Sequence, residues 1–283
     1  MTTSKIAFEK KGGDDFARAA QLYRSNNYGD ALALFERLIA ADPTSIDGLL
    51  SYGNTLFELN RDDEAIACYD KVIAMEPDHP DAHFGKAFPV LANGDYVLGW
   101  KLYEWRWKTK PFHSLIRKYD QPRWSGNADL TGKTILIYGE QGFGDSIQFS
   151  RYLKLFNNSR VIFEIRKPLA ALFRDHEIVT QGEPLPSFDY HCPLMSLPLA
   201  FETTIETIPP ALHISADAGK IDKWRKLLGK KTKPRIGLTW AGHPHSHNDS
   251  KRSIPLETLL PIMTDNVEWF SLQREVRDRD RGA

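Results

Sequence analysis

The sequence has little cysteine, no long apolar run and no net charge. Its two cysteines, Cys68 and Cys192, are far apart, so no disulfide is expected and both thiols are predicted to be buried in a reducing compartment. No stretch approaches the roughly 18 apolar residues of a membrane-spanning helix. Residues 1–11 are polar and lack the apolar core of a signal peptide, which predicts a cytoplasmic location. Lys plus Arg and Asp plus Glu number 37 each, so no global field attracts nucleic acid or an acidic membrane surface.

A pattern of small, aromatic and proline residues repeats every 34 positions in the first third of the chain. The residues that recur are Pro43, Pro77 and Pro111, the aromatics Phe35, Tyr69 and Tyr103, and the small residues Ala19, Gly53, Ala87, Ala31, Ala65 and Gly99. This order and spacing are typical of the tetratricopeptide repeat (TPR), in which each unit is two antiparallel helices. Residues 12–110 are therefore predicted to form three repeats of a helical solenoid, whose groove binds a protein or peptide.

The third repeat departs from the other two in its second helix. That helix is unusually rich in large aromatics, namely Tyr96, Trp100, Tyr103, Trp105 and Trp107. Five large rings exceed what one repeat needs to seal its own core. We expect Trp100, Trp105 and Trp107 to be buried between the solenoid and the domain that follows.

After a segment rich in Pro and Gly, strands and helices alternate. Residues 111–132 are expected to be either a linker or an ordered segment anchored by Trp124. Strands are expected at 134–138, 161–165, 178–179, 188–191, 235–240 and 268–272, and helices at 147–156, 168–173, 221–228 and 256–263. Such alternation predicts an α/β fold with a Rossmann-like parallel sheet over residues 133–232.

A second set of strands begins near Arg235, in residues 233–283. Too few residues follow it to complete a doubly wound domain, which needs about 100 residues or more. The second sheet is therefore either incomplete, or its strands join the first sheet. The charged tail 273–281 is expected to be the solvated start of a helix.

The segment 138–146 follows a predicted strand and opens a helix. Gly142 and Gly144 allow tight turns, and the helix N-terminus offers unpaired amides. Asp145 would lie at the carboxyl edge of the sheet, as a general base or a carboxylate that binds a hydroxyl. The alternative is a helix N-cap with glycines that serve the turn. The dinucleotide fingerprint is absent because no third glycine follows.

The loop after the Arg235 strand contains His243, His245 and His247, followed by Lys251 and Arg252. A metal site is disfavoured because no Cys or carboxylate lies at helical spacing from them. A phosphate-binding loop fits better, since a guanidinium binds phosphate bidentately. A polar solvated loop is the alternative.

Together these features resemble bacterial TPR proteins that carry a glycosyltransferase-like domain of the GT-B fold. That family is related to the lipopolysaccharide heptosyltransferases and, more distantly, to protein O-GlcNAc transferases. The likeness spans residues 12–273 and is carried by the segments 99–107, 140–149, 191–198, 237–242 and 252–255.

The resemblance implies two facing Rossmann-like lobes, with the acceptor in the first and a nucleotide-sugar donor in the second. It implies that Asp145 is the base and that Arg252 contacts the donor phosphates, while the residues of the loop offer Lys251 as a further phosphate-binding cation. The residues expected to contact substrate are Gln141, Gly142, Gly144, Gln148, His245 and His247. No cofactor or metal is implied beyond the nucleotide-sugar itself.

Two departures from the family pattern leave two hypotheses for the function. The family has one His where this chain has His245 and His247, and nothing after Gln273 matches the segment that grips the nucleotide-sugar. The chain is therefore either a TPR-linked glycosyltransferase with a truncated second lobe, or a non-catalytic interaction scaffold with a degenerate one.

Overall fold

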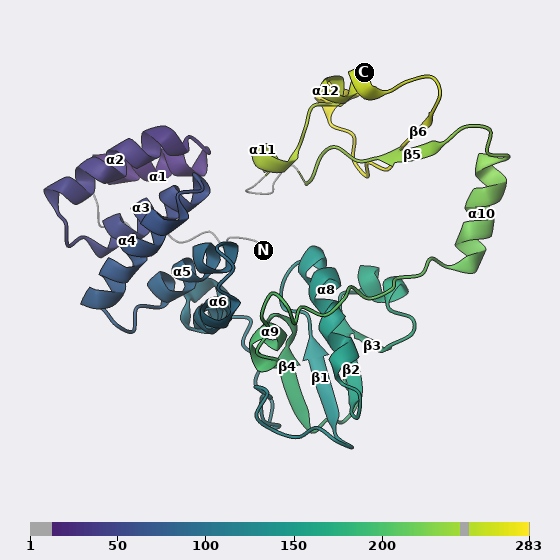
Figure 1. The fold of residues 1–283 in the computed structure, drawn as a ribbon, viewed down its shortest axis with the longest axis horizontal. Coiled ribbons are helices and arrows are strands. Elements are labelled where there is room, and N and C mark those ends of the chain that lie inside the picture. The colour runs from purple at the N-terminus through teal and green to yellow at the C-terminus, as the bar shows by residue number, and fades with distance from the viewer. Residues whose placement is uncertain (1–12, 244–248, 283) are drawn as a thin grey trace. The chain divides into compact units, whose positions relative to one another are not determined.

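The computed structural model describes residues 13–243 and 249–282. The chain divides into two compact units, one ending at Ser215 and one beginning at Ala216. Figure 1 shows the helical repeats and a four-stranded sheet in the first unit, and a two-stranded sheet in the second.

The repeats form three helix pairs, as the 34-residue period predicts. The helices are α1 (Asp14–Arg24), α2 (Tyr28–Ala41), α3 (Ile46–Glu58), α4 (Asp62–Met75), α5 (Pro80–Ala92) and α6 (Tyr96–Tyr103). The small residues let helices approach, since a Cβ added at Gly99 would lie 2.6 Å from Leu91 and one at Gly85 would lie 2.7 Å from Tyr69. The aromatics Phe35, Tyr69 and Tyr103 are all buried.

The turns inside the three pairs follow the same period. Asn26, Asn60 and Gly94 are 34 residues apart and adopt the left-handed conformation, with φ of 62°, 58° and 88°. Asn and Gly are the residues that tolerate this conformation best.

The third repeat continues into irregular helix instead of a fourth pair. Helix α6 runs directly into the 3-10 helix η1 (Glu104–Lys108), which is followed by the short α7 (Lys110–His113). Trp100 is buried against Phe149 of the next domain, with ring centroids 5.8 Å apart. Trp105 and Trp107 are only partly buried, although both pack against the same core, so the expected burial is incomplete for these two.

The α/β region contains one parallel sheet. Its strands are β1 (Thr134–Tyr138), β2 (Arg160–Ile165), β3 (Glu177–Thr180) and β4 (Tyr190–Pro193), in the order β3-β2-β1-β4. All three pairings are parallel, which confirms the predicted parallel sheet. Between the strands lie the helices α8 (Phe143–Phe149), η2 (Ser150–Leu155) and η3 (Lys167–Leu172), and η4 (Leu194–Ser196) and α9 (Leu197–Ala200) follow β4.

The two faces of this sheet are covered differently. One face, with Ile137 and Phe163, shares a continuous core with Trp100 and Tyr103 of the repeats. The other face is covered by the segments around Tyr119 and Phe188. The solenoid and the sheet are therefore joined by a common hydrophobic core.

The segment 111–132 is ordered and wraps along the sheet. Trp124 is buried, and its ring lies 5.4 Å from that of Phe156 and 5.2 Å from that of Phe201. Arg123 forms a parallel bridge with His191 on β4. Of the two alternatives, the anchored segment is the one observed.

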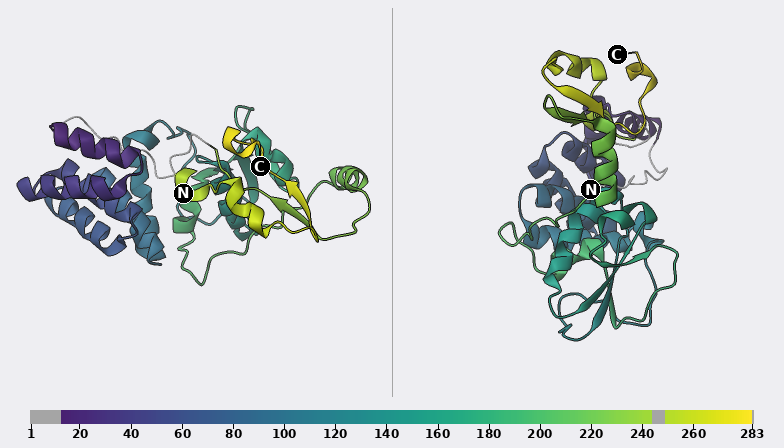
Figure 2. Two further views of the ribbon diagram at one scale, coloured as in Figure 1. Left: turned by 90° about the horizontal axis from the view of Figure 1, so that it is seen from above. Right: turned by 90° about the vertical axis from the view of Figure 1, so that its right-hand side faces the viewer.

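The second unit has its own sheet. Its elements are α10 (Ala218–Leu228), β5 (Arg235–Leu238), α11 (Asp249–Arg252), α12 (Leu256–Leu259), η5 (Leu260–Ile262), β6 (Glu268–Ser271) and η6 (Asp278–Asp280). Strands β5 and β6 pair in parallel and lie side by side in Figures 1 and 2, as a two-stranded sheet of their own. Among the described residues of this unit only Trp240 and Asp280 are buried, and the indole Nε1 donates to Oδ2 of Asp280 at 3.0 Å.

Two details of the elements differ from the expectation. The helix expected to begin at Ile147 begins at Phe143, because the turn requires only residues 139–142. The tail 273–281 does not start a long helix; it contains a loop and the three-residue η6. Within the described ranges, no helix is long and apolar enough to cross a membrane.

Candidate functional site at the carboxyl edge of the sheet

The strand order creates a switch point between β1 and β4. The chain leaves β1 toward β2 and β3 on one side and returns to β4 on the other side. In open α/β sheets, ligands bind in the crevice at the carboxyl ends of the strands at such a point. Here Glu140 follows β1 and Ser196 follows β4, so these two residues lie at the switch point.

The crevice is filled by Arg106, which comes from η1 of the repeat domain. Its side chain is fully buried. The guanidinium donates to Oε1 of Glu140 at 3.3 Å and to Oγ of Ser196 at 2.7 Å. It also lies over the rings of Tyr103 and Trp107, 4.6 and 4.4 Å from their centroids. An arginine from the solenoid thus occupies the place where such sheets usually hold a ligand.

A second arginine and a second glutamate complete the cluster. Glu104 Oε1 accepts hydrogen bonds from Arg106 at 2.5 Å and from Ser196 at 2.8 Å. Arg123 donates to Glu104 and, at 2.7 Å, to Oγ of Ser196. The cluster therefore pairs two guanidiniums with two carboxylates, with Arg106 and Glu140 buried, Glu104 partly buried and Arg123 exposed at its edge.

Burial and the arginines act in opposite directions on the two carboxyl groups. Burial alone would raise the pKa of Glu104, but Arg106 and Arg123 outweigh it and hold that pKa below its ordinary value. For Glu140 burial dominates and raises the pKa, with Arg106 offsetting only part of the rise. Among the described residues, Glu140 Oε2 and Arg106 Nε have no hydrogen-bond partner.

The sequence reasoning did not identify this cluster. Glu104 and Arg106 lie in the aromatic segment 99–107, which was treated as core and as part of a resemblance. Glu140 begins the glycine segment, in which the sequence indicated Asp145 as the functional residue. The available signal was the alternation of Glu104 and Arg106 with the aromatic residues 103–107, since buried charges need a partner.

Asp145 lies where the sequence placed it, at the start of α8 beyond the end of β1. Its carboxylate is buried, and Oδ2 accepts the Gly142 N–H at 3.1 Å. This contact satisfies one of the free amides at the helix N-terminus, close to the capping role given as the alternative. Whether Asp145 also acts as a base stays a prediction.

The other residues expected to contact an acceptor do not form one group. Gln141 is buried, and its Nε2 donates to the Tyr103 hydroxyl at 2.6 Å, so it faces the solenoid. Gly142 closes the turn against Asp145, whereas a Cβ at Gly144 would meet nothing within 4 Å. Gln148 is exposed.

Gln148 borders a small crevice of its own. That crevice has a volume of about 120 Å³ and lies between α6 and α8. Its lining residues are Tyr96, Trp100, Gln148, Phe149, Arg151, Tyr152, Thr203 and Ile208. Gln148 is therefore separated from the cluster around Arg106.

The residues expected to bind the nucleotide-sugar donor lie in the second unit. Lys251 and Arg252 are exposed at the end of α11, and the Arg252 side chain lies against Gly242. His245 and His247 fall outside the described residues. In the described part of the chain, no three His, Cys, Asp or Glu are grouped to hold a metal ion.

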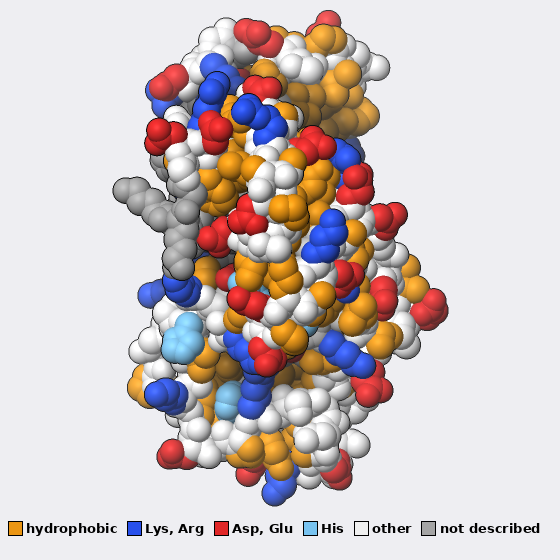
Figure 3. Space-filling view, turned by 90° about the vertical axis from the view of Figure 1, so that its left-hand side faces the viewer, with side chains coloured by type: hydrophobic (Ala, Val, Ile, Leu, Met, Phe, Trp, Pro, Cys, Tyr) orange, Lys and Arg blue, Asp and Glu red, His pale blue; other side chains and the backbone are white. Residues whose placement is uncertain are grey.

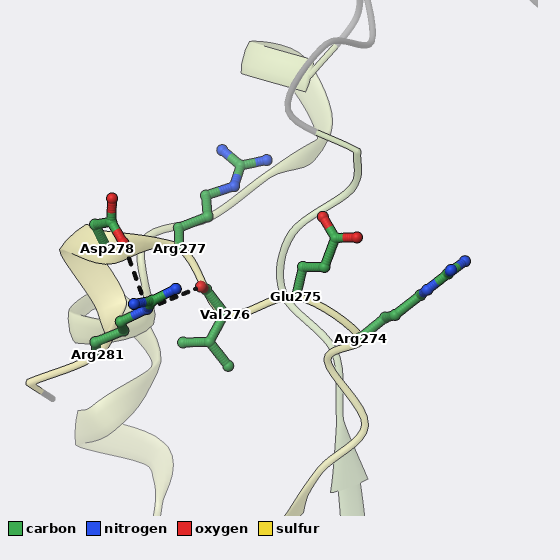
Figure 4. Close-up of a pocket in the computed structure, with 6 residues that line it drawn as sticks. All are labelled: Arg274, Glu275, Val276, Arg277, Asp278 and Arg281. Atoms are coloured by element: carbon green, nitrogen blue, oxygen red, sulfur yellow. Dashed lines mark hydrogen bonds and ion pairs between the residues drawn. The ribbon is translucent and has the colours of Figure 1, made fainter.

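A further group of arginines follows β6. They line an open cavity of about 660 Å³, whose lining residues are Arg274, Glu275, Val276, Arg277, Asp278 and Arg281 (Figure 4). Arg277 is paired with Asp249 at 2.6 Å and Arg281 with Asp278 at 3.4 Å, while Arg274 extends away from them. Because the guanidiniums do not converge, they do not form a ready clamp for phosphate.

The molecular surface carries charges of both signs. On the face drawn in Figure 3, acidic and basic side chains are interspersed with apolar ones. This distribution agrees with the equal numbers of acidic and basic residues in the whole chain.

Comparisons with known proteins identify the helical region. Residues 22–88 match a family model described as tetratricopeptide repeat, so this part of the chain is a TPR domain. The chain is also 26% identical over 285 residues to Protein FlbA of Caulobacter vibrioides. That match covers 87% of this chain and 47% of the relative, so the chain spans about half the relative's length.

Two solved structures show weaker likeness. The type III secretion translocator chaperone SycD of Yersinia enterocolitica is 22% identical, covering 38% of this chain and 87% of that one, with a TM-score of 0.33. A mutant O-GlcNAc transferase of Thermobaculum terrenum is 12% identical, covering 53% of this chain and 36% of that one, with a TM-score of 0.33. Both TM-scores lie below 0.5, so neither likeness supports an inference about function.

Proposed function

We propose that this chain recruits a polypeptide through its TPR domain and holds it in a fixed relation to the attached α/β lobe. The observation that carries the proposal is the TPR domain itself, three helix pairs of which residues 22–88 match the family model. The core shared with the sheet supports the second half of the proposal, because it joins the TPR domain to the α/β lobe in one unit.

An open cavity on the solenoid is where we expect a peptide side chain to bind. It has a volume of about 410 Å³ and is lined by Phe16, Thr44, Ser45, Ile46, Asp47, Glu76 and His79. These residues come from α1, from the first turn of α3 and from the two turns that join successive repeats. Its carboxylates favour a peptide with a basic residue.

The test is a peptide array followed by calorimetric titration of the best sequences. We expect binding tighter than about 100 μM, or about −5.5 kcal/mol. Glu76→Arg should weaken it about tenfold by reversing a charge on the cavity wall, while Glu257→Arg, an exposed change in the second unit, should not. Absence of any peptide in this affinity range would refute the proposal.

Glycosyl transfer is the second candidate function. It is favoured by Asp145, which lies at the start of α8 beyond the carboxyl end of β1, and by the family resemblance. It is disfavoured by Arg106, which fills the switch-point crevice, and by arginines that do not converge in the second unit. The interaction scaffold without catalysis is therefore at least as well supported.

Titration with UDP- and ADP-sugars distinguishes the two candidates. A working donor site should bind one of them tighter than about 100 μM. If transfer is found, Asp145→Asn should abolish it while the fold is retained, since the amide cannot accept the acceptor's proton. Transfer at an unchanged rate would remove Asp145 from the mechanism.

A further inference from the structure

Helix α10 exposes an apolar stripe that the rest of its unit leaves uncovered. Ile221, Trp224 and Leu227 are 43%, 55% and 68% exposed, and no residue of the helix is buried. Their spacing of three residues places them along one side of the helix. An exposed stripe that contains a Trp indicates a surface that meets a partner.

The same segment is strongly basic, although the whole chain is neutral. Residues 217–235 contain eight cations, Lys220, Lys223, Arg225, Lys226, Lys230, Lys231, Lys233 and Arg235, and only two anions, Asp217 and Asp222. The balanced total of the chain therefore hides a local positive field. Within about 10 Å, such a field is felt at moderate salt.

The helix is preformed rather than dependent on a partner. Asp217 caps its start by accepting the Lys220 N–H at 2.8 Å, and Gly229 ends it with φ of 62°. Arg235 of β5 donates to the carbonyl oxygen of Leu228 at 2.6 Å and so fixes the last turn. Little ordering cost remains when the stripe binds.

We propose that α10 docks the chain on an anionic lipid bilayer. The helix lies in the plane of the interface, with Ile221, Trp224 and Leu227 among the headgroups and acyl boundary and the lysines on lipid phosphates. A basic helix with an apolar stripe and a Trp is the pattern of interfacial helices, because an indole prefers the boundary between apolar and wet surroundings. Nucleic acid would use the cations but would leave the stripe exposed.

This role goes beyond peptide recruitment, because it gives the TPR domain a location. The helix rests on the surface and does not span the membrane, since its 11 residues are too few and too charged to cross a bilayer.

The experiment is co-sedimentation of the 283-residue chain with vesicles. Vesicles of phosphatidylcholine with about 30% phosphatidylserine should bind it at least about tenfold more strongly than pure phosphatidylcholine. Binding should fall steeply as salt is raised, because the Debye length shrinks to about 3 Å at 1 M. Brominated acyl chains should quench part of the tryptophan emission.

Matched variants identify the helix as the cause. Trp224→Ala should lower binding about tenfold through lost apolar contact, and Lys223→Gln with Lys226→Gln should lower it roughly fivefold per lysine. The controls are Ile205→Ala, an apolar residue 61% exposed in the first unit, and Lys101→Gln with Lys118→Gln, which removes the same charge elsewhere. Circular dichroism checks that each variant is folded.

Three outcomes would overturn the proposal. Equal binding to neutral and anionic vesicles would exclude the electrostatic part, and unchanged binding of the α10 variants would exclude the helix. If the chain ignores vesicles but binds duplex DNA or polyglutamate through the same residues, the occupant is nucleic acid or an acidic protein instead.

Discussion

Arg106 is the residue on which the junction between solenoid and sheet depends. Arg106→Met would leave Glu104 and Glu140 with fewer partners in a buried setting. Because removal of the guanidinium leaves the carboxylates of Glu104 and Glu140 without their charged partner, we expect the free energy of unfolding to fall by about 3–5 kcal/mol. Urea denaturation followed by circular dichroism measures this change.

Arg160 provides the matched control for that experiment. It pairs with Glu177, and both side chains are well exposed. Since exposed ion pairs contribute little, Arg160→Met should leave the urea midpoint nearly unchanged. If the two variants behaved alike, the cluster around Arg106 would not be a buried network.

Both cysteines should be inert in the folded protein. Cys68 and Cys192 are free and buried, and burial raises the pKa of each thiol. The reactive thiolate is therefore disfavoured in both residues, in addition to being inaccessible. A chromogenic disulfide reagent should titrate no thiol in native protein and two in urea, whereas rapid native labelling would show that one site opens.

At the scale of single residues, the sequence identified positions better than roles. Asp145 could be placed at the start of α8, because glycines and a strand precede it. Its hydrogen bond to Gly142 could not be foreseen, since an acidic residue in a first helical turn serves capping and catalysis equally well. Arg106 was marked only by its place among aromatic residues, and its partners Glu140 and Ser196 could not be identified because they lie 34 and 90 residues away in the chain.

Among the helices, the close packing of α6 on α5 depends on Gly99, which has no side chain. A Cβ at Gly99 would come within 2.6 Å of Leu91. Gly99→Ala should therefore lower the free energy of unfolding by about 1–3 kcal/mol, despite the better helix propensity of Ala.

Gly144 gives the opposite expectation within α8. A Cβ there would meet no atom within 4 Å. Gly144→Ala should therefore raise stability by about 0.5–1 kcal/mol through helix propensity. Thermal melts of both variants measure the contrast, and equal shifts of the same sign would contradict it.

The elements were predictable where a pattern repeats and less so where it does not. The 34-residue period located all six repeat helices, because each position in it has one packing role. The short strands β3 and β4 were predicted approximately, since a short β-branched pair such as Ile178 and Val179 between polar segments is typical of a short strand. The predicted start of α8 was wrong, because glycines such as Gly142 and Gly144 indicate a loop even where, as at Gly144, the helix has already begun.

For the whole molecule, the sequence indicated two α/β regions but could not decide whether they share a sheet. Parallel pairing depends on contacts between strands far apart in the chain, which no local pattern encodes. The structure shows that β5 and β6 form a separate sheet. The two units also differ in their hydrophobic cores. The first unit contains a large cluster whose buried residues range from Phe84 to Leu197, whereas the second unit buries little besides Trp240.

This difference predicts two unfolding transitions in calorimetry. The repeats and the four-stranded sheet should melt together, because the third repeat shares one core with the sheet and the earlier repeats stack on it through α4 and α5. The unit from Ala216 should melt first, because little apolar surface stabilises it. Limited thermolysin digestion should correspondingly cut first within residues 209–217, which join the two units, or within the second unit. A repeat domain that melted apart from the sheet would show that the Arg106 cluster does not couple them, whatever its static geometry.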